Sequence, residues 1–178
     1  MILVENLFNT LKKNKIDFFT GVPDSILKKF SSFLEKFPNK QHMIAVNEGS
    51  AASIGIGYYL STKKIPCIYF QNSGLSNAIN PLISIASKEV YSIPLLLMIG
   101  WRGSPKIKDE PQHKVKGEIT KKLLTLLGIK YCIINTKKDL RKLNFLIKIS
   151  KAKNRVVACL IANKVLKADI KSKKKEKS

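Results

Sequence analysis

Residues 43–57 read MIAVNEGSAASIGIG, an apolar run that passes through Asn-Glu-Gly into a run of small residues. The apolar run predicts a buried strand, and the small-residue run predicts a closely packed helix. Glu48 would then lie where the carboxyl end of a strand meets the start of a helix. Open α/β sheets bind ligands at such positions, although a glutamate there can also simply complement the helix dipole.

Outward from this junction, predicted helices and strands alternate along the chain. Near-continuous apolar strands joined by helices indicate a parallel sheet that is buried on both faces. The predicted fold is therefore α/β: a three-layer sandwich with a central, mostly parallel sheet of about six strands and helices on both faces. Helices are expected at 3–14, 24–37, 49–61, 75–86, 117–127 and 137–149, strands at 16–20, 42–46, 65–70, 94–99, 130–134 and 155–161, and a long polar loop at 100–116.

One domain over residues 1–162 suits a chain of 178 residues that is 44% hydrophobic. Residues 163–178 are predicted to form a lysine-rich, disordered tail. No apolar run reaches the roughly 18 residues that a membrane span needs, and residues 1–6 lack the basic region of a signal peptide. We therefore expect a cytoplasmic protein without a membrane segment.

The cysteines and the charge narrow the class of protein further. Cys67, Cys132 and Cys159 each lie in an apolar run without a CxxC pair, which predicts buried free thiols and no structural zinc. The net charge of +21 is spread along the chain, as in a solvated basic surface, so nucleic acid is not the expected partner. A non-catalytic domain that binds polyanions such as RNA remains the rival class.

Polar side chains follow several of the predicted strands, and the carboxyl ends of parallel strands share one edge of a sheet. Each has an ordinary interpretation as a helix cap, turn residue or surface side chain. An arginine at 102 can also bind an anionic group in bidentate geometry, and a histidine at 113 can transfer protons near neutral pH. The candidate residues are Asp24, Glu48, Gln71, Asn72, Ser73, Arg102, Gln112 and His113.

As an ordered set, these motifs resemble the pyrimidine-binding domain of thiamine-diphosphate-dependent 2-oxoacid decarboxylases. Within that family the similarity is strongest to the phosphonopyruvate decarboxylases. The related sulfopyruvate decarboxylase alpha subunits share QNSGL at 71–75 and the Arg-Gly at 102–103, but typically lack Pro-Asp and Asp-Glu-Pro-Gln-His. The resemblance covers about residues 5–135, with matching stretches at 18–25, 47–49, 65–75, 77–78, 80–81, 90–94, 99–103 and 109–113.

The resemblance implies decarboxylation of 3-phosphonopyruvate to phosphonoacetaldehyde and carbon dioxide, with sulfopyruvate as the alternative substrate. Glu48 would activate the cofactor, thiamine diphosphate, by a hydrogen bond to N1′ of its aminopyrimidine. Asp24 and His113 would transfer protons, and Arg102 with Gln112 would hold the anionic end of the substrate. Residues 71–73, that is Gln71, Asn72 and Ser73, would line the cofactor pocket.

One departure from the family pattern concerns the cofactor's diphosphate. Full-length relatives bind it through Mg²⁺ with a Gly-Asp-Gly motif in a second domain, and this sequence contains no Gly-Asp-Gly. We therefore expect no metal ligands in this chain and a partner subunit that carries the diphosphate-binding domain. Whether the chain is a subunit of a split enzyme or a truncated product stays open.

Overall fold

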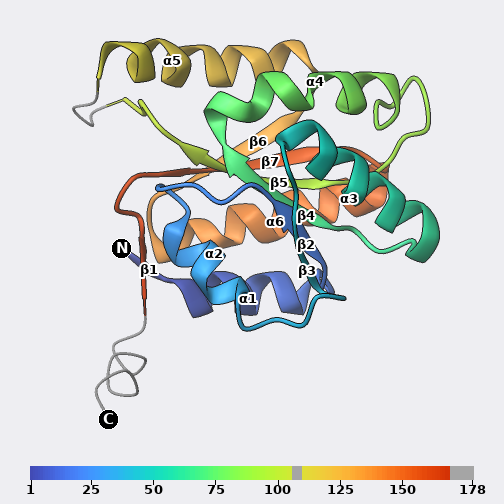
Figure 1. The fold of residues 1–178 in the computed structure, drawn as a ribbon, viewed down its shortest axis with the longest axis horizontal. Helices are drawn as coiled ribbons and strands as arrows, with labels where there is room; N and C mark the ends of the chain where they lie inside the picture. Colours follow the sequence, from blue (N-terminus) through green and yellow to red (C-terminus); the bar gives the residue numbers. More distant parts are fainter. Residues whose placement is uncertain (106–109, 169–178) are drawn as a thin grey trace.

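A computed structural model describes residues 1–105 and 110–168, in which six parallel strands form one sheet (Figure 1). The order across the sheet is β3-β2-β4-β5-β7-β6, and every neighbouring pair is parallel. All six strands therefore end at the same edge of the sheet. Their bounds are β2 Phe19–Gly21, β3 His42–Ile44, β4 Cys67–Gln71, β5 Leu96–Trp101, β6 Lys130–Ile134 and β7 Val157–Ala162.

Helices cover both faces of the sheet, which confirms the predicted three-layer α/β sandwich (Figure 1). One face carries α1 (Val4–Lys13), α2 (Lys28–Leu34) and α6 (Leu140–Lys153). The other face carries α3 (Glu48–Thr62), α4 (Leu75–Ser84) and α5 (Pro111–Leu126). Two short 3₁₀ turns precede helices: η1 (Asn72–Gly74) before α4 and η2 (Lys137–Asp139) before α6.

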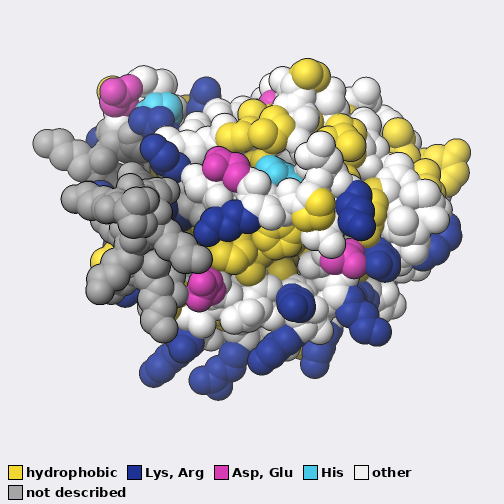
Figure 2. All heavy atoms as spheres, turned by 60° about the horizontal axis from the view of Figure 1, so that its bottom comes forward, with side chains coloured by type: hydrophobic (Ala, Val, Ile, Leu, Met, Phe, Trp, Pro, Cys, Tyr) yellow, Lys and Arg dark blue, Asp and Glu magenta, His cyan; other side chains and the backbone are white. Residues whose placement is uncertain are grey.

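Basic side chains are spread over the surface in Figure 2, which brings forward the side that lies at the bottom of Figure 1. They line the lower margin of this view, with few acidic side chains among them. The spread agrees with a solvated basic surface. In the described residues, no helix combines the length and the hydropathy that a membrane span requires.

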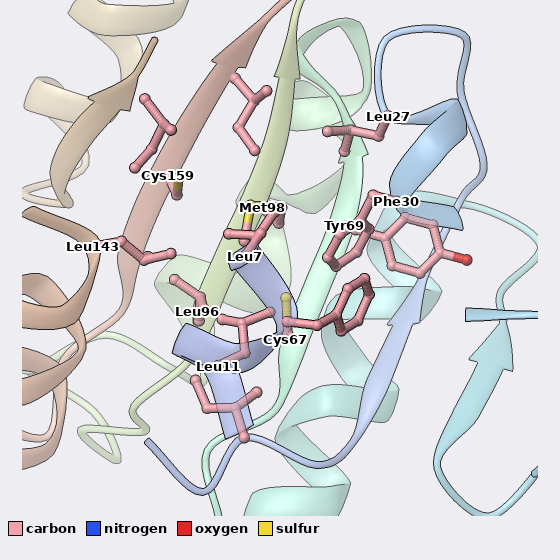
Figure 3. Packing of buried hydrophobic residues seen from close by; sticks show 14 of the residues in the cluster. Leu7, Leu11, Leu27, Phe30, Cys67, Tyr69, Leu96, Met98, Leu143 and Cys159 are labelled. Carbon is pink, nitrogen blue, oxygen red and sulfur yellow. The ribbon is translucent and has the colours of Figure 1, made fainter. Parts of the chain in front are cut away.

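Strand residues alternate between two cores, one on each side of the sheet. On the side of α1, α2 and α6, Tyr69 and Met98 pack among leucines and Phe30 (Figure 3). Their strand neighbours Phe70 and Ile99 belong to the opposite core, with α3, α4 and α5. Burial on both faces is the reason that the central strands read as continuous apolar runs.

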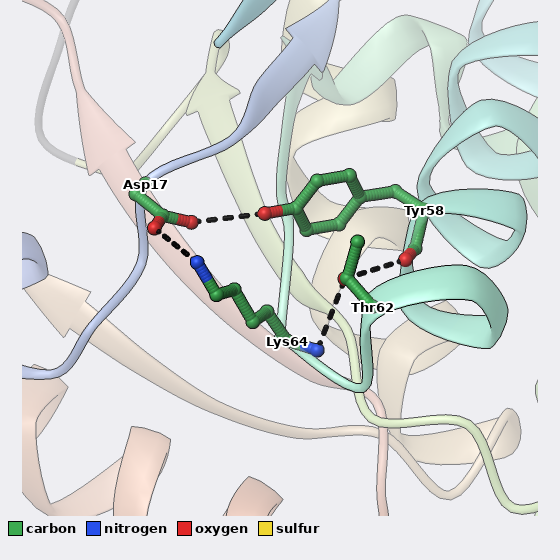
Figure 4. A network of polar contacts seen from close by, with 4 residues as sticks. All are labelled: Asp17, Tyr58, Thr62 and Lys64. Atoms are coloured by element: carbon green, nitrogen blue, oxygen red, sulfur yellow. Dashed lines mark hydrogen bonds and ion pairs between the residues drawn. The ribbon is translucent and has the colours of Figure 1, made fainter. Parts of the chain in front are cut away.

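The carboxyl-terminal end of α3 is fixed to the start of β2 by a polar network (Figure 4). Tyr58 donates a hydrogen bond from Oη to Asp17 Oδ1 at 2.9 Å, and Lys64 Nζ lies 2.9 Å from Asp17 Oδ2. The Tyr58 ring also stacks on Phe18, with ring centroids 4.2 Å apart. These contacts hold the carboxyl-terminal end of α3 against the start of β2.

Several boundaries differ from those predicted. The loop expected at 100–116 is wrong, because β5 runs to Trp101 and α5 begins at Pro111. The helix expected from residue 24 begins only at Lys28. Beyond residue 162, β8 (Leu166–Lys167) pairs with β1 (Ile2–Leu3), so the segment proposed as a tail begins with packed residues.

The remainder of that segment, residues 169–178, lies outside the described residues, as does Asp109 of the Asp-Glu-Pro-Gln-His motif. The prediction of free thiols is confirmed. Cys67 and Cys159 are buried, whereas Cys132 is half-buried.

Candidate active site

Glu48 is the first residue of α3 and lies beside the start of α4. The helix begins there because Asn47 caps it, accepting a hydrogen bond from the backbone N–H of Ser50 at 2.8 Å. The Glu48 side chain is half-buried, and its Oε2 accepts a hydrogen bond from Asn77 Nδ2 at 2.9 Å. The carboxylate is therefore held by a side chain of the neighbouring helix.

Two glycines allow this close approach of α3 and α4. A Cβ on Gly74 would lie 2.1 Å from Glu48 Oε1, and one on Gly49 would lie 2.8 Å from the carbonyl oxygen of Asn77. Neither position has space for a side chain unless its neighbours move. The Asn-Glu-Gly and Ser-Gly motifs thus form a single packed unit, although about 25 residues separate them in the sequence.

Asp24 lies over the end of β5. Its Oδ1 accepts hydrogen bonds from the backbone N–H groups of Ile26 (2.6 Å) and Leu27 (3.1 Å), so it does cap the turn that leads into α2. The second oxygen, Oδ2, is buried without a hydrogen-bond partner in the described structure. A Cβ on Gly100 would lie 2.9 Å from Asp24 Oδ1, so the carboxyl group rests directly on the strand backbone.

Burial raises the pKa of the Asp24 carboxyl above its ordinary value. Four groups oppose this effect: the two capping N–H groups, the side chain of Gln71 and the charge of Arg102. Gln71 is the last residue of β4, and Arg102 directly follows β5. The structure therefore brings Asp24, Gln71 and Arg102 together, as the topology of the sheet predicts.

Gln71 and Ser73 lie on the path between this group and Glu48. Ser73 donates a hydrogen bond from Oγ to Gln71 Oε1 at 3.0 Å, and both side chains are half-buried. The next residue is Gly74, which packs under Glu48. Residues 71–74 thus connect the two carboxylates along the carboxyl edge of the sheet.

Asn72 is placed differently from Gln71 and Ser73. Its side chain is buried, donates to the carbonyl oxygen of Arg102 (3.0 Å) and to Thr120 Oγ1 (2.8 Å), and accepts from the backbone N–H of Arg102 (3.0 Å). The NH₂ group and the carbonyl oxygen of the Asn72 amide are thus both hydrogen-bonded within the fold. This geometry supports a positioning role in which Asn72 ties the Arg102 turn to η1 and α5.

The Arg102 turn also packs against the first turns of α5. Gly103 has φ +68°, and a Cβ there would lie 1.7 Å from the carbonyl oxygen of His113. A Cβ on Gly117 would lie 1.8 Å from the carbonyl oxygen of Gly103. Trp101 adds a hydrogen bond from Nε1 to the carbonyl oxygen of Gly117 at 3.0 Å. Arg102 therefore projects from a rigid junction of β5 and α5.

His113 and Gln112 lie in the first turn of α5 and not in a loop, as the sequence had suggested. The His113 ring is mostly buried, with Nε2 3.9 Å from Glu110 Oε2 and with Nδ1 buried without a hydrogen-bond partner in the described structure. Gln112 is exposed and donates to Glu110. His113 thus reaches the Arg102 turn through its backbone carbonyl, and the side chains of both residues lie beside Glu110.

Two residues of this region had no predicted role. Asn77 holds Glu48, and Thr120 pairs with Asn72. The start of α5 did have a signal in the sequence, since proline at 111 is favoured at the first position of a helix. Asn77 lies in one of the stretches that carry the family resemblance, but its partner could not be predicted, because an asparagine inside a helix pattern has no expected partner until α3 is in place.

No group of three or more His, Cys, Asp or Glu side chains in the described ranges is arranged to hold a metal ion. The expectation that Mg²⁺ ligands belong to a partner therefore stays a prediction.

Comparison with known proteins gives matches over most of the chain. Residues 1–126 match the family model described as "Thiamine pyrophosphate enzyme, N-terminal TPP binding domain". Phosphonopyruvate decarboxylase from Streptomyces viridochromogenes is 37% identical over 114 residues, which are 64% of this chain and 28% of that protein. Sulfopyruvate decarboxylase subunit alpha from Methanococcus maripaludis is 34% identical over 139 residues, 78% of this chain and 81% of that subunit.

Solved structures give the same fold at lower identity. The crystal structure of benzoylformate decarboxylase from Polynucleobacter necessarius superposes with a TM-score of 0.69 and 19% identity, covering 90% of this chain and 29% of that one. The 4-hydroxybenzoylformate decarboxylase of Rhodococcus jostii gives a TM-score of 0.65 and 18% identity. This chain thus spans less than a third of these two structures and of the phosphonopyruvate decarboxylase that it matches.

Proposed function

Since this chain belongs to the thiamine pyrophosphate enzymes, as a form of their N-terminal domain, we propose that it is the pyrimidine side of a thiamine-diphosphate-dependent decarboxylase. The proposed reaction converts 3-phosphonopyruvate to phosphonoacetaldehyde and carbon dioxide. The proposed active form includes a partner chain with the diphosphate-binding domain and its Mg²⁺.

The arrangement of Glu48 is the observation that supports this proposal most directly. A carboxyl group at the carboxyl edge of the sheet, fixed by Asn77 and pressed against Gly74, is the group that an aminopyrimidine ring requires. The residues present therefore fit the cofactor. Thiamine diphosphate, when bound, supplies an acidic thiazolium carbon and an electron sink for decarboxylation.

In this proposal each residue of the chain has a separate task. Glu48 would hold the aminopyrimidine ring by a hydrogen bond from its carboxyl group, while Asn77 fixes Oε2 of that group. Asp24 is suited to donating a proton, because its raised pKa keeps the acid form populated to higher pH. Its Oδ2 has no hydrogen-bond partner in the described structure but is buried, so a substrate would reach it only after the groups that cover it move. Asn72 keeps the Arg102 turn in place.

Arg102 is proposed to bind the anionic end of the substrate. It extends from the rigid junction beside Asp24, and its charge already influences the Asp24 carboxyl. A guanidinium forms bidentate, charge-assisted hydrogen bonds with phosphonate and sulfonate groups alike. Gln112 would help to bind the anionic end of the substrate only after its side chain turns away from Glu110. His113 is proposed to transfer protons through its imidazole ring, which is mostly buried.

Two features bear on the choice of substrate and on the partner. Pro23-Asp24 and the segment that ends in His113 favour the phosphonopyruvate enzymes, in line with the 37% identity to one of them. The match to 81% of a sulfopyruvate decarboxylase alpha subunit favours the alternative substrate and an assembly of two kinds of subunit. Phosphonopyruvate is the preferred proposal, and sulfopyruvate is the second.

The experiment is to assay the chain with and without a partner chain that carries Gly-Asp-Gly, using 3-phosphonopyruvate, sulfopyruvate and pyruvate. Carbon dioxide release that needs both chains and Glu48 is the expected result. Glu48→Gln should lower turnover by at least about 10²-fold, whereas Glu89→Gln, at an exposed ion pair with Lys88, should have no effect. Equal turnover of Glu48→Gln and the wild type would refute the proposal.

The rival class, a polyanion-binding domain, makes the opposite prediction. Its activity would be salt-sensitive binding of RNA that is indifferent to Glu48. The Glu48–Asn77 arrangement has no role in such a protein, and for this reason the catalytic function is preferred.

A further inference from the structure

A shallow trough runs along β6, the strand at the end of the sheet opposite to β3. Its largest hollow, about 940 Å³, lies between α5 and α6 and is lined by Tyr131, Ile133 and Leu146 among others. Two adjoining hollows of about 770 and 160 Å³ share lining residues with it. We call the three together the edge trough.

The edge trough exposes apolar side chains that the fold does not cover. Phe145 on α6 is 66% exposed and Leu126 at the end of α5 is 83% exposed. Aromatic and aliphatic side chains that border a hollow of this size are typical of interaction surfaces. The trough is remote from the carboxyl groups of the candidate active site, since β7 and β5 separate β6 from β4.

The backbone of β6 has an open side as well. Over the described ranges, β6 pairs with β7 alone, so its outer edge presents N–H and C=O groups to the trough. An extended segment can add to such an edge as a further strand, with alternate side chains directed into the hollow. The backbone thus specifies the conformation of the occupant.

The charges around the trough favour an acidic binding partner. Among the described residues that line the three hollows, Glu118 is the only acid. Lys142 is neutralised by Asp139 at 2.7 Å, so the positive rim consists of the remaining basic side chains. These are Lys121, Lys122, Lys130 and Lys153, whereas Arg155 shares a further adjoining hollow with Glu89.

We propose that the edge trough docks an acidic, amphipathic segment of a partner protein, which adds to the sheet beside β6 as an extended strand. Its apolar side chains would fill the hollow next to Phe145, and its carboxylates would face the basic rim. A second copy of this chain fits less well, because two identical basic rims would face each other. The proposal does not depend on the catalytic function, and its test measures binding.

The test uses the full chain and a fluorescein-labelled peptide, Glu-Val-Glu-Phe-Glu-Val-Glu, with fluorescence anisotropy as the readout. The peptide should bind saturably, and its lysine-for-glutamate counterpart should not. Methylating alternate backbone nitrogens of the peptide should weaken binding, since strand pairing needs those N–H groups. Equal binding of the acidic and basic peptides, or no effect of methylation, would overturn the proposal.

Protein variants locate the site. Phe145→Asp should weaken binding about tenfold or more, and Leu126→Asp serves as a second variant in case the first fails to fold. Tyr91→Asp is the matched control, because Tyr91 is a similarly exposed aromatic residue (70%) that lines none of the three hollows. Equal affinity of the Phe145, Leu126 and Tyr91 variants would refute the assignment, as would sedimentation showing that the trough variants abolish a dimer of this chain.

Discussion

Replacing Gly74 with alanine should separate the stability of the fold from the activity of the site. Gly74 has φ −85° and ψ −4°, a negative-φ conformation at the margin of the right-handed helical region that alanine can also adopt. A Cβ there would lie 2.1 Å from Glu48 Oε1 and 2.2 Å from the carboxyl carbon. Because a half-buried glutamate side chain can rotate more easily than the backbone can shift, we expect Glu48 to move and its hydrogen bond with Asn77 to break.

The two effects on stability nearly cancel. Alanine in place of glycine at a helical position contributes up to about 1 kcal/mol. A hydrogen bond such as that between Asn77 and Glu48 contributes about 0.5–1.5 kcal/mol. The free energy of unfolding should therefore change by less than about 1 kcal/mol, or about 2–4 °C in Tm for a chain of this size. Turnover should fall by about 10²-fold, the usual cost of misplacing a catalytic group by 1 Å.

Gly57→Ala is the control for this experiment. Gly57 also lies in a helix, but a Cβ there would have nothing within 4 Å. It should raise the free energy of unfolding by about 1 kcal/mol and leave turnover unchanged. Both variants are compared by thermal unfolding of the chain and by carbon dioxide release with the partner chain present. Near wild-type turnover of Gly74→Ala would refute the role of the Glu48 position, and a loss of several kcal/mol would show that Glu48 cannot move.

Three further predictions concern the neighbouring residues. Because burial raises the pKa of Asp24 above its unfolded value of 3.8, the native chain binds this proton more tightly, so its contribution to stability grows as pH falls toward 3.8. Asp24→Asn should remove that dependence, raise Tm at neutral pH and lower turnover, and an unchanged pH profile of Tm would contradict this. Asn72→Ala should cost about 2–4 kcal/mol in urea unfolding, since it leaves the buried Arg102 N–H and Thr120 hydroxyl without this partner, and a loss below about 1 kcal/mol would show that water replaces the amide. Arg102→Ala should lower kcat/KM for phosphonopyruvate about 10- to 100-fold and that for pyruvate much less, whereas equal losses would indicate a fold defect.

The sequence predicted the layers of the fold because burial on both faces leaves a direct trace in composition. Apolar runs such as that ending at Phe70 indicated central strands by their short length and flanking turn residues, and the parallel direction followed from the helices between them. The boundaries of α2 and α5 were harder to predict from the sequence. Asp24 was expected to start a helix. It instead caps the turn at residues 24–27, and α2 begins directly after this turn, at Lys28. For α5, the run of polar residues concealed a helix that Pro111 begins.

The candidate site was predicted in part for the same reason. Which strand ends come together follows from topology, and this brought Asp24, Gln71 and Arg102 to one place. Which side chains are available to a ligand does not follow, because it depends on hydrogen bonds between distant segments. Asn72 had the same expected role as Gln71, but its amide is used between Arg102 and Thr120.

The two carboxylates of the site differ in a way that suggests how they divide the chemistry. Glu48 is accessible and fixed by a neutral amide, so it can form a lasting hydrogen bond with a bound ring without a change in the surrounding fold. Asp24 is buried, has one oxygen without a partner, and is held close to a cationic side chain. Enzymes give two carboxyl groups different proton-transfer tasks by placing them in different surroundings. Under the proposed function, Glu48 would therefore act on the cofactor and Asp24 on the reacting carbon.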